Sequence, residues 1–198
     1  MTDRPLSTKD RLIRVAAELF RTRGYHGVGL SELLSAAKAP KGSLYHHFPA
    51  GKSDLAVAAA DWASDGMLRI IAESFEPAED FRAGATTLCY KLAKLFDLSG
   101  KWDGCPISAT LFEGPENEQF LRHARHLFEG WIGEVAHHGE RFGYSGEDAR
   151  TQSEHLFMLF QGGWQLARAR HDSDVIRHLP RHLALTPPST VDGASAQV

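Results

Sequence analysis

Cysteine is scarce in this 198-residue chain, which contains only Cys89 and Cys105, and these two do not form a Cys-x-x-Cys pair. A disulfide framework and a structural zinc site of the thiolate type are therefore both disfavoured. No apolar run approaches the roughly 20 residues that span a bilayer. The opening MTDRPLSTKDR also lacks the apolar stretch of a secretory signal. We therefore expect a cytoplasmic protein without membrane contact.

Signatures of common enzymes and of β-sheets are missing as well. The sequence contains no G-x-S-x-G, G-x-G-x-x-G or H-E-x-x-H motif, the patterns of a nucleophile elbow, a dinucleotide site and a zinc protease. No segment alternates apolar and polar residues over a sustained stretch, so we expect no strands. The chain is expected not to be an enzyme, and we assign no cofactor and no metal site to it.

Charge is unevenly distributed along the chain. Residues 1–52 contain nine Lys or Arg against four Asp or Glu, a balance of +5, whereas the net charge of the whole chain is −3. The difference leaves −8 for residues 53–198. A basic N-terminal quarter on an acidic body indicates that one end of the protein meets a polyanion. Chance variation of surface charge is the alternative interpretation.

Apolar residues recur at helical spacing throughout the chain, which predicts an all-α fold. The predicted helices cover about 8–23, 29–37, 40–47, 53–75, 78–98, 105–113, 116–142, 147–171 and 173–184. We divide the chain into an N-terminal helix-turn-helix domain of residues 1–52 and a helical ligand-binding and dimerisation domain of residues 53–185. Residues 186–198 are small and polar, a composition that predicts a disordered tail.

Two short helices joined by a tight turn and braced by a longer first helix are the parts of a helix-turn-helix. Leu33 and Leu44 belong to the apolar faces with which the two short helices pack inward. The second short helix must also expose small or polar residues if it is to enter a major groove about 12 Å wide. The residues that meet this requirement are Pro40, Lys41, Gly42, Ser43, Tyr45 and His46.

The run from Gly24 to Leu55, and above all its segment KGSLYHHFPAGKSDL, resembles the DNA-binding domain of the tetracycline-repressor (TetR/AcrR) family. The resemblance implies a three-helix DNA-binding domain, a variable helical ligand domain and a homodimer. By position, the residues that it implies to face double-stranded operator DNA are Lys41, Gly42, Ser43, Tyr45 and His46, with Lys52 on a phosphate.

Two positions depart from the family pattern. Lys38 stands at the turn position that glycine normally occupies, so this lysine is expected to need a positive φ. Pro40 replaces the usual Ser or Thr near the start of the recognition helix and removes one backbone N–H that could bind phosphate. We therefore expect the fold to be that of the family, and the contacts with operator DNA to differ in detail from those of the usual family pattern.

The segment Gly104-Cys105-Pro106-Ile107, followed by a helix-forming stretch, resembles the C-terminal domain of the LmrA/YxaF-like branch of this family. The resemblance implies a repressor of a neighbouring gene. We therefore expect a ligand-responsive repressor that binds a palindromic operator as a dimer. A small hydrophobic effector is expected to release it from the DNA.

Aromatic residues are frequent in the second domain, and most of them are expected in its core. The resemblance implies a ligand pocket lined by such residues together with a few polar groups. The candidates for this effector pocket are Tyr90, Trp102, Cys105, Phe112, Trp131, Met158 and Gln161. For each of them, plain packing is at least as good an interpretation.

The helix predicted at 147–171 has a second apolar face, which indicates an interface between two copies of the chain. Its residues are spaced by four, three and four positions, and its glycine permits a close approach of helices. Together with the last helix, the candidate interface residues are Leu156, Phe160, Gly163, Ala167, Ile176 and Leu179. An ordinary core within one chain is the alternative.

A thiol- or metal-responsive regulator of the same fold is the alternative function. Cys105 could sense oxidants if a helix N-terminus stabilises its thiolate. Two histidine pairs have a helical spacing that suits paired metal ligands, and these are His123 with His126 and His178 with His182. No acid or cysteine obviously completes either pair. A helical interaction module whose helix-turn-helix no longer binds DNA is a further alternative.

Overall fold

The computed structural model describes residues 6–101, 104–112 and 117–183, and every regular element within these ranges is a helix. The predicted all-α class is therefore confirmed. No described helix is long and apolar enough to cross a membrane. The predicted tail and the pocket candidate Trp102 lie outside the described residues. The helices are α1 (Thr8–Arg23), α2 (Leu30–Ala36), α3 (Lys41–His47), α4 (Lys52–Phe75), α5 (Phe81–Leu98), α6 (Pro106–Leu111), α7 (Glu118–Arg141), α8 (Gly146–Arg170), α9 (Asp174–Arg177) and the 3-10 helix η1 (Leu179–His182).

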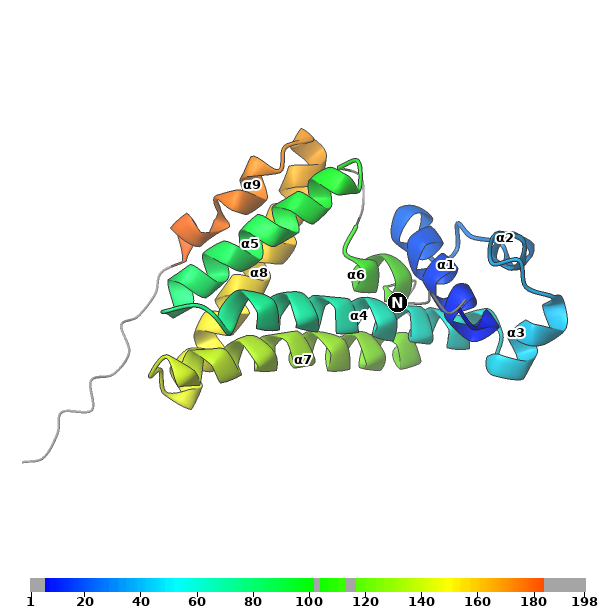
Figure 1. The fold of residues 1–198 in the computed structure, drawn as a ribbon, viewed down its shortest axis with the longest axis horizontal. Coiled ribbons are helices and arrows are strands. Elements are labelled where there is room, and N and C mark those ends of the chain that lie inside the picture. Colours follow the sequence, from blue (N-terminus) through cyan, green and yellow to red (C-terminus); the bar gives the residue numbers. More distant parts are fainter. Residues whose placement is uncertain (1–5, 102–103, 113–116, 184–198) are drawn as a thin grey trace, which may run out of the picture.

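The molecule is elongated, with α1, α2 and α3 clustered at one end (Figure 1). From this cluster α4 runs along the length of the molecule beside α7. Helix α5 packs on α4, α8 packs on α7, and α9 contacts both α5 and α8. The short α6 contacts both α1 and α4. The N-terminal cluster is thus joined to the rest of the protein by packed helices.

Local signals in the sequence set several of the helix ends. The hydroxyls of Ser7 and Ser145 each accept a hydrogen bond at 3.1 Å from a backbone N–H three residues on, and so cap α1 and α8. Gly24, with a φ of 72°, ends α1. The prediction of one helix over 173–184 was wrong, because that segment consists of α9 and η1. Pro180 explains the break, since it has no N–H and its ring collides with the preceding helical turn.

The core of the helical domain is built around the C-terminal end of α4. Phe75 is fully buried, and its ring packs edge-on against that of Phe81 at the start of α5, with the centroids 5.5 Å apart. Gly84 makes room for this ring, because a Cβ added there would lie 2.4 Å from Cδ1 of Phe75. Protein interiors do not tolerate so close an approach, so the packing of α5 on α4 depends on glycine at this position.

The apolar face predicted as a dimer interface lies inside a single protomer. All six candidates are buried, namely Leu156, Phe160, Gly163, Ala167, Ile176 and Leu179. A Cβ added to Gly163 would lie 2.6 Å from Cδ2 of Leu179, so this glycine brings α8 close to η1 of the same chain. The dimer role of these residues stays a prediction, because burial in one protomer does not test it and Gly163 and Leu179 also line an open groove beside α8. The spacing of apolar residues marks a buried face but does not say which helix covers it.

A polar cluster fastens α9 to the C-terminal end of α5. Arg177 Nη2 donates a hydrogen bond to Asp97 Oδ2 at 2.6 Å, and the Ser173 hydroxyl donates to the same oxygen at 3.0 Å. Partial burial by itself would raise the pKa of Asp97. The hydrogen bonds from Ser173 and Arg177 and the positive charges of Arg177 and Lys101 outweigh burial, so the pKa of Asp97 is lowered.

Replacing Gly84 with alanine is expected to lower the free energy of unfolding by about 1–3 kcal/mol, because the new methyl group collides with the Phe75 ring. Gly130→Ala on α7 is the matched control, since a Cβ there meets nothing within 4 Å. The control should be neutral or stabilising by up to about 1 kcal/mol, the gain in helix propensity. Urea unfolding of both variants checks this, and equal stabilities would contradict it.

Asp97→Asn is expected to reduce stability at neutral pH by up to about 1 kcal/mol. A carboxylate whose pKa is lowered by folding stabilises the protein above its unfolded pKa of about 3.9, and this contribution is lost as the pH falls through the folded value. The difference in thermal midpoint between the variant and the parent should therefore shrink in acid. Asp65→Asn, at an exposed position of α4, serves as the control. A difference that persists unchanged at low pH would refute the role of the charge.

Candidate functional site

The turn between α2 and α3 has the backbone form of a helix C-terminal cap. The N–H of Lys38 donates to the carbonyl of Ser35 at 3.1 Å, and the N–H of Ala39 donates to the carbonyl of Leu34 at 2.9 Å. This pair of hydrogen bonds is a Schellman motif, in which the residue after the cap adopts a positive φ. Lys38 has a φ of 49°, so the strained lysine predicted from the sequence is confirmed.

Helix α1 holds this turn and both short helices in place. Arg11 Nε donates a hydrogen bond at 3.2 Å to the carbonyl of Ala37, at the end of α2. Phe20 of α1, Leu33 of α2 and Leu44 of α3 are all fully buried and belong to one core. The inward faces of the helix-turn-helix therefore fix the direction in which α3 presents its outer face.

The outer face of α3 carries the side chains predicted to meet DNA. Lys41, Gly42, Tyr45 and His46 are exposed and Ser43 is half-buried, and α3 lies at the extreme end of the molecule (Figure 1). A Cβ added to Gly42 would meet nothing within 4 Å, so the surface there is open. This face offers an ammonium group, hydroxyls and an imidazole without a competing carboxylate on α3. Such groups suit phosphates and base edges.

Lys52 is the exception among the predicted DNA contacts. Its Nζ donates a hydrogen bond at 2.6 Å to the carbonyl of Tyr25 and lies 4.2 Å from the centroid of the Tyr25 ring. In the chain by itself the ammonium group is thus held by a carbonyl and an aromatic face, and the phosphate contact of Lys52 stays a prediction. Tyr25 also packs edge-on against Phe120 of α7, at a centroid distance of 5.4 Å. Lys52, Tyr25 and Phe120 thus connect the N-terminal helices to α7, a link that no motif in the sequence signalled.

The predicted effector residues are brought together only in part. Trp131 and Phe112 both contact the ring of Phe128, at centroid distances of 5.4 and 5.9 Å. Trp131 lines an inner cavity of about 30 Å³ and donates a hydrogen bond at 2.9 Å to the hydroxyl of Ser64. A volume of this size holds about one water molecule. The cavity is far smaller than the roughly 300–1,000 Å³ of small-molecule sites.

The other described candidates for the effector pocket do not line the inner cavity. Two of them are exposed, and two form a contact of their own. Tyr90 and Met158 are among the most exposed large apolar residues of the described chain, on the outer faces of α5 and α8, and neither lines the inner cavity. Their assignment to the effector pocket stays a prediction, and Met158 lines the open groove beside α8 instead of the inner cavity. Gln161 Nε2 and Cys105 Sγ form a contact of 3.7 Å between α8 and the start of α6.

The thiol and metal alternatives gain no support from the described residues. Cys105 is buried, and burial raises the pKa of Cys89 to about 12, so that Cys89 is a thiol at neutral pH. His123 Nε2 lies 2.6 Å from Asp61 Oδ1, which ties α7 to α4. Over residues 6–101, 104–112 and 117–183, no three His, Cys, Asp or Glu side chains converge as metal ligands would.

Comparison with known proteins gives two family matches along the chain. Residues 12–59 match the model for bacterial regulatory proteins of the tetR family, and residues 77–182 match the model for the C-terminal domain of LmrA/YxaF-like transcriptional regulators. The HTH-type transcriptional regulator LmrA of Bacillus subtilis is 27% identical over 173 residues, which cover 87% of this chain and 92% of LmrA.

Solved structures give the same fold. The reduced form of NemR from Escherichia coli matches with a TM-score of 0.77 at 23% identity, covering 92% of this chain and 98% of NemR. A cysteine mutant of the TetR-family regulator CifR, complexed with a 26-bp operator DNA, matches with a TM-score of 0.76 at 18% identity. That match covers 92% of this chain and all of the CifR chain, 100%.

Proposed function

This chain belongs to the TetR family of bacterial transcriptional regulators, with a C-terminal domain of the LmrA/YxaF-like type, and from this premise we propose that it is a homodimeric repressor. In this proposal the outer face of α3 reads a palindromic operator. A small hydrophobic effector bound by the helical domain then releases the protein from DNA.

The composition of the α3 face is the observation that carries the proposal. Lys41, Tyr45 and His46 project outward from a helix whose other side, with Leu44, is buried against α1. Gly42 adds an opening where a base edge or a phosphate can approach the backbone. The basic balance of residues 1–52 favours the same end of the molecule for a polyanion.

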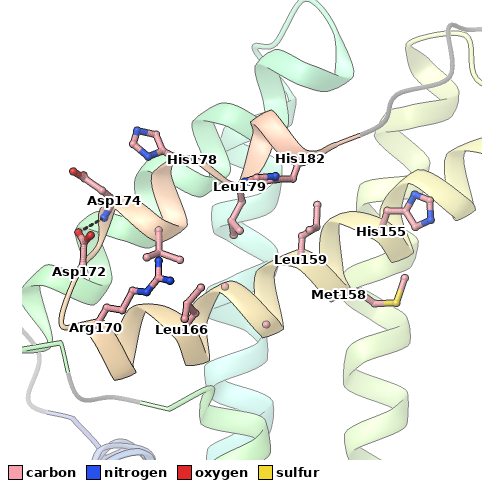
Figure 2. A pocket seen from close by; sticks show the side chains of 13 residues that line it. His155, Met158, Leu159, Leu166, Arg170, Asp172, Asp174, His178, Leu179 and His182 are labelled. Atoms are coloured by element: carbon pink, nitrogen blue, oxygen red, sulfur yellow. Dashed lines mark hydrogen bonds between the residues drawn. The ribbon is translucent and has the colours of Figure 1, made fainter.

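A second copy of the chain is proposed to dock on the outer face of α8. The face that α8 turns away from its own core, together with α9 and η1, forms an open groove of about 910 Å³. Figure 2 shows Leu159 and Leu166 on α8 and Leu179 on η1 lining this groove. Met158 and Leu166, four-tenths or more exposed, give it an apolar rim, and Gly162 leaves room for a close helix approach. A twofold axis through this face would give the dimer the two reading helices that a palindrome requires.

The effector is proposed to act by changing the distance between the two α3 helices of the dimer. Operator half-sites lie about 34–36 Å apart, so a small tilt of α4 would spoil the fit to both at once. The ligand can drive this only through different affinities for the two arrangements, typically about 1–3 kcal/mol of coupling. By the same linkage, operator DNA must weaken binding of the effector.

Lys41→Ala and Tyr45→Ala are each expected to weaken operator binding by about 1–3 kcal/mol without unfolding the protein, because both side chains are exposed. The operator is first selected from a pool of random double-stranded DNA with the full-length protein, and affinities are then measured by fluorescence anisotropy. Lys94→Ala and Tyr90→Ala, exposed positions on α5, are the matched controls. If both α3 variants bind like their controls, or if no sequence is enriched, the proposed function is wrong.

Leu166→Glu is expected to shift the dimer toward the monomer, because it places a carboxylate on the apolar rim of the proposed contact. Leu121→Glu on α7, at a similar exposure of 44% against 42% for Leu166, should leave the dimer intact. Sedimentation equilibrium at micromolar concentration distinguishes the two. A parent protein that sediments only as a 21.9 kDa monomer would overturn the dimer itself.

A further inference from the structure

The turn between α2 and α3 holds a lysine in a backbone conformation that favours glycine. Lys38 has a φ of 49°, in the left-handed region where the Cβ of an L-residue is unfavourable. Such a conformation persists only where the surrounding structure imposes it, and it is most common at functional sites. The shape of the turn by itself does not explain the lysine, because glycine would adopt this shape more easily.

The backbone of this turn is held by bonds within the protein and has no N–H left for an outside acceptor. The N–H groups of Lys38 and Ala39 both donate to carbonyls of α2, and Pro40 has no N–H. From the other side, Arg11 of α1 donates to the Ala37 carbonyl at 3.2 Å. The Lys38 side chain is exposed, so its ammonium group is the donor that residues 38–40 present to solvent.

The charge of Lys38 is not balanced by a neighbouring carboxylate. Within the part of the chain that the structure describes, the Lys38 ammonium group forms no hydrogen bond and no ion pair. No Asp or Glu occurs in residues 33–53, and the carboxylate of Glu32, on α2, is paired with Arg23. A cation that is carried on a fixed backbone without a partner favours an anion from outside the protein.

The location of the turn indicates which anion this is. In a helix-turn-helix bound to DNA, the first helix crosses the sugar-phosphate backbone and the second places its N-terminal residues against base edges. The turn between them therefore lies beside the phosphates that flank the major groove. In Figure 1 the connection from α2 to α3 lies at the same end of the molecule as α3. Lys38 precedes Lys41, the first residue of α3, by three positions.

We propose that Lys38 binds a backbone phosphate of the operator, and that the protein gives up stability at this turn in exchange for affinity for DNA. The inference rests on the proposed function, because it takes α3 as the reading helix. A phosphate contact fixes the position of a protein on the duplex and carries no sequence information. Lys38 thus contributes to affinity, whereas the outer face of α3 contributes to the choice of sequence.

Lys38→Gly should change stability and DNA binding in opposite directions. Glycine adopts the positive φ without strain, so the midpoint of thermal unfolding of the full-length protein should rise by about 2–4 °C. The same substitution removes a charged hydrogen bond to phosphate, so the affinity for the selected operator should fall by on the order of tenfold. A midpoint that falls, or an operator affinity equal to that of the parent, would overturn the proposal.

Lys101→Gly is the matched control, because it also replaces a lysine of positive φ and removes one positive charge. Lys101 follows the C-terminal end of α5, which lies well apart from α3 in Figure 1, so this variant should bind operator like the parent. Lys38→Arg keeps the charge and should also bind like the parent. Lys38→Asn tolerates the conformation without the charge and should bind as weakly as Lys38→Gly. Equal losses for Lys38→Gly and Lys101→Gly would show an effect of net charge and refute the contact.

The salt dependence of binding identifies the acceptor as a phosphate. Each phosphate contact contributes about 0.9 to the slope of log affinity against log salt concentration, so the two Lys38 contacts of a dimer contribute about 1.8. The slope for Lys38→Gly should be smaller in magnitude by this amount. The loss of affinity should also be the same on a scrambled duplex of equal length and composition. An unchanged slope, or a loss confined to the selected operator, would overturn the assignment to phosphate.

The phosphate contact and the proposed function fail in different ways. If Lys41→Ala and Tyr45→Ala weaken operator binding while Lys38→Gly does not, α3 reads the DNA without help from Lys38, and the phosphate contact alone is wrong. If no duplex is selected from the random pool, the repressor function is wrong and the Lys38 contact falls with it.

Discussion

The continuity of α4 is the constraint on which the rest of the structure depends. This single helix of 24 residues buries Leu55, Ala56, Ala59 and Ala60 in its first half, where α1 packs on it, and Ile71 and Phe75 near its end. At 1.5 Å per residue it is about 36 Å long. Because no flexible linker interrupts it, the position of the helix-turn-helix is determined by packing inside the helical domain.

Several contacts between side chains also hold the N-terminal helices and α7 in place against α4. Lys52 at the start of α4 holds the Tyr25 carbonyl, Tyr25 packs on Phe120 of α7, and His123 reaches Asp61 of α4. These links cross between helices that are distant in the sequence. A displacement of α1 relative to α4 or α7 must therefore break or reshape them together.

The predicted helices agree with the structure wherever a local signal specifies an end. Ser7 and Gly24 delimit α1, and the positive φ at Lys38 follows from the turn that the helix-turn-helix pattern demands. The exposed face of α3 could also be inferred, since its apolar side is set by the helical repeat. The break at Pro180 was not predicted, because the apolar spacing of the last segment continues past the proline and so hides the cost of proline within a helix.

Sequence alone determined the helical class, the position of the helix-turn-helix and the residues α3 turns outward, because each depends on interactions within a few residues of the chain. Only the tertiary structure decided what covers each apolar face. It placed Gly163 against Leu179 of the same chain and turned Met158 outward. It also placed the Lys52 ammonium group on the Tyr25 carbonyl, and it placed Arg21 of α1 and Trp62 of α4 in the lining of one groove. The helical repeat specifies that a face is buried or exposed, but its partner is chosen by distant segments that share no periodicity with it.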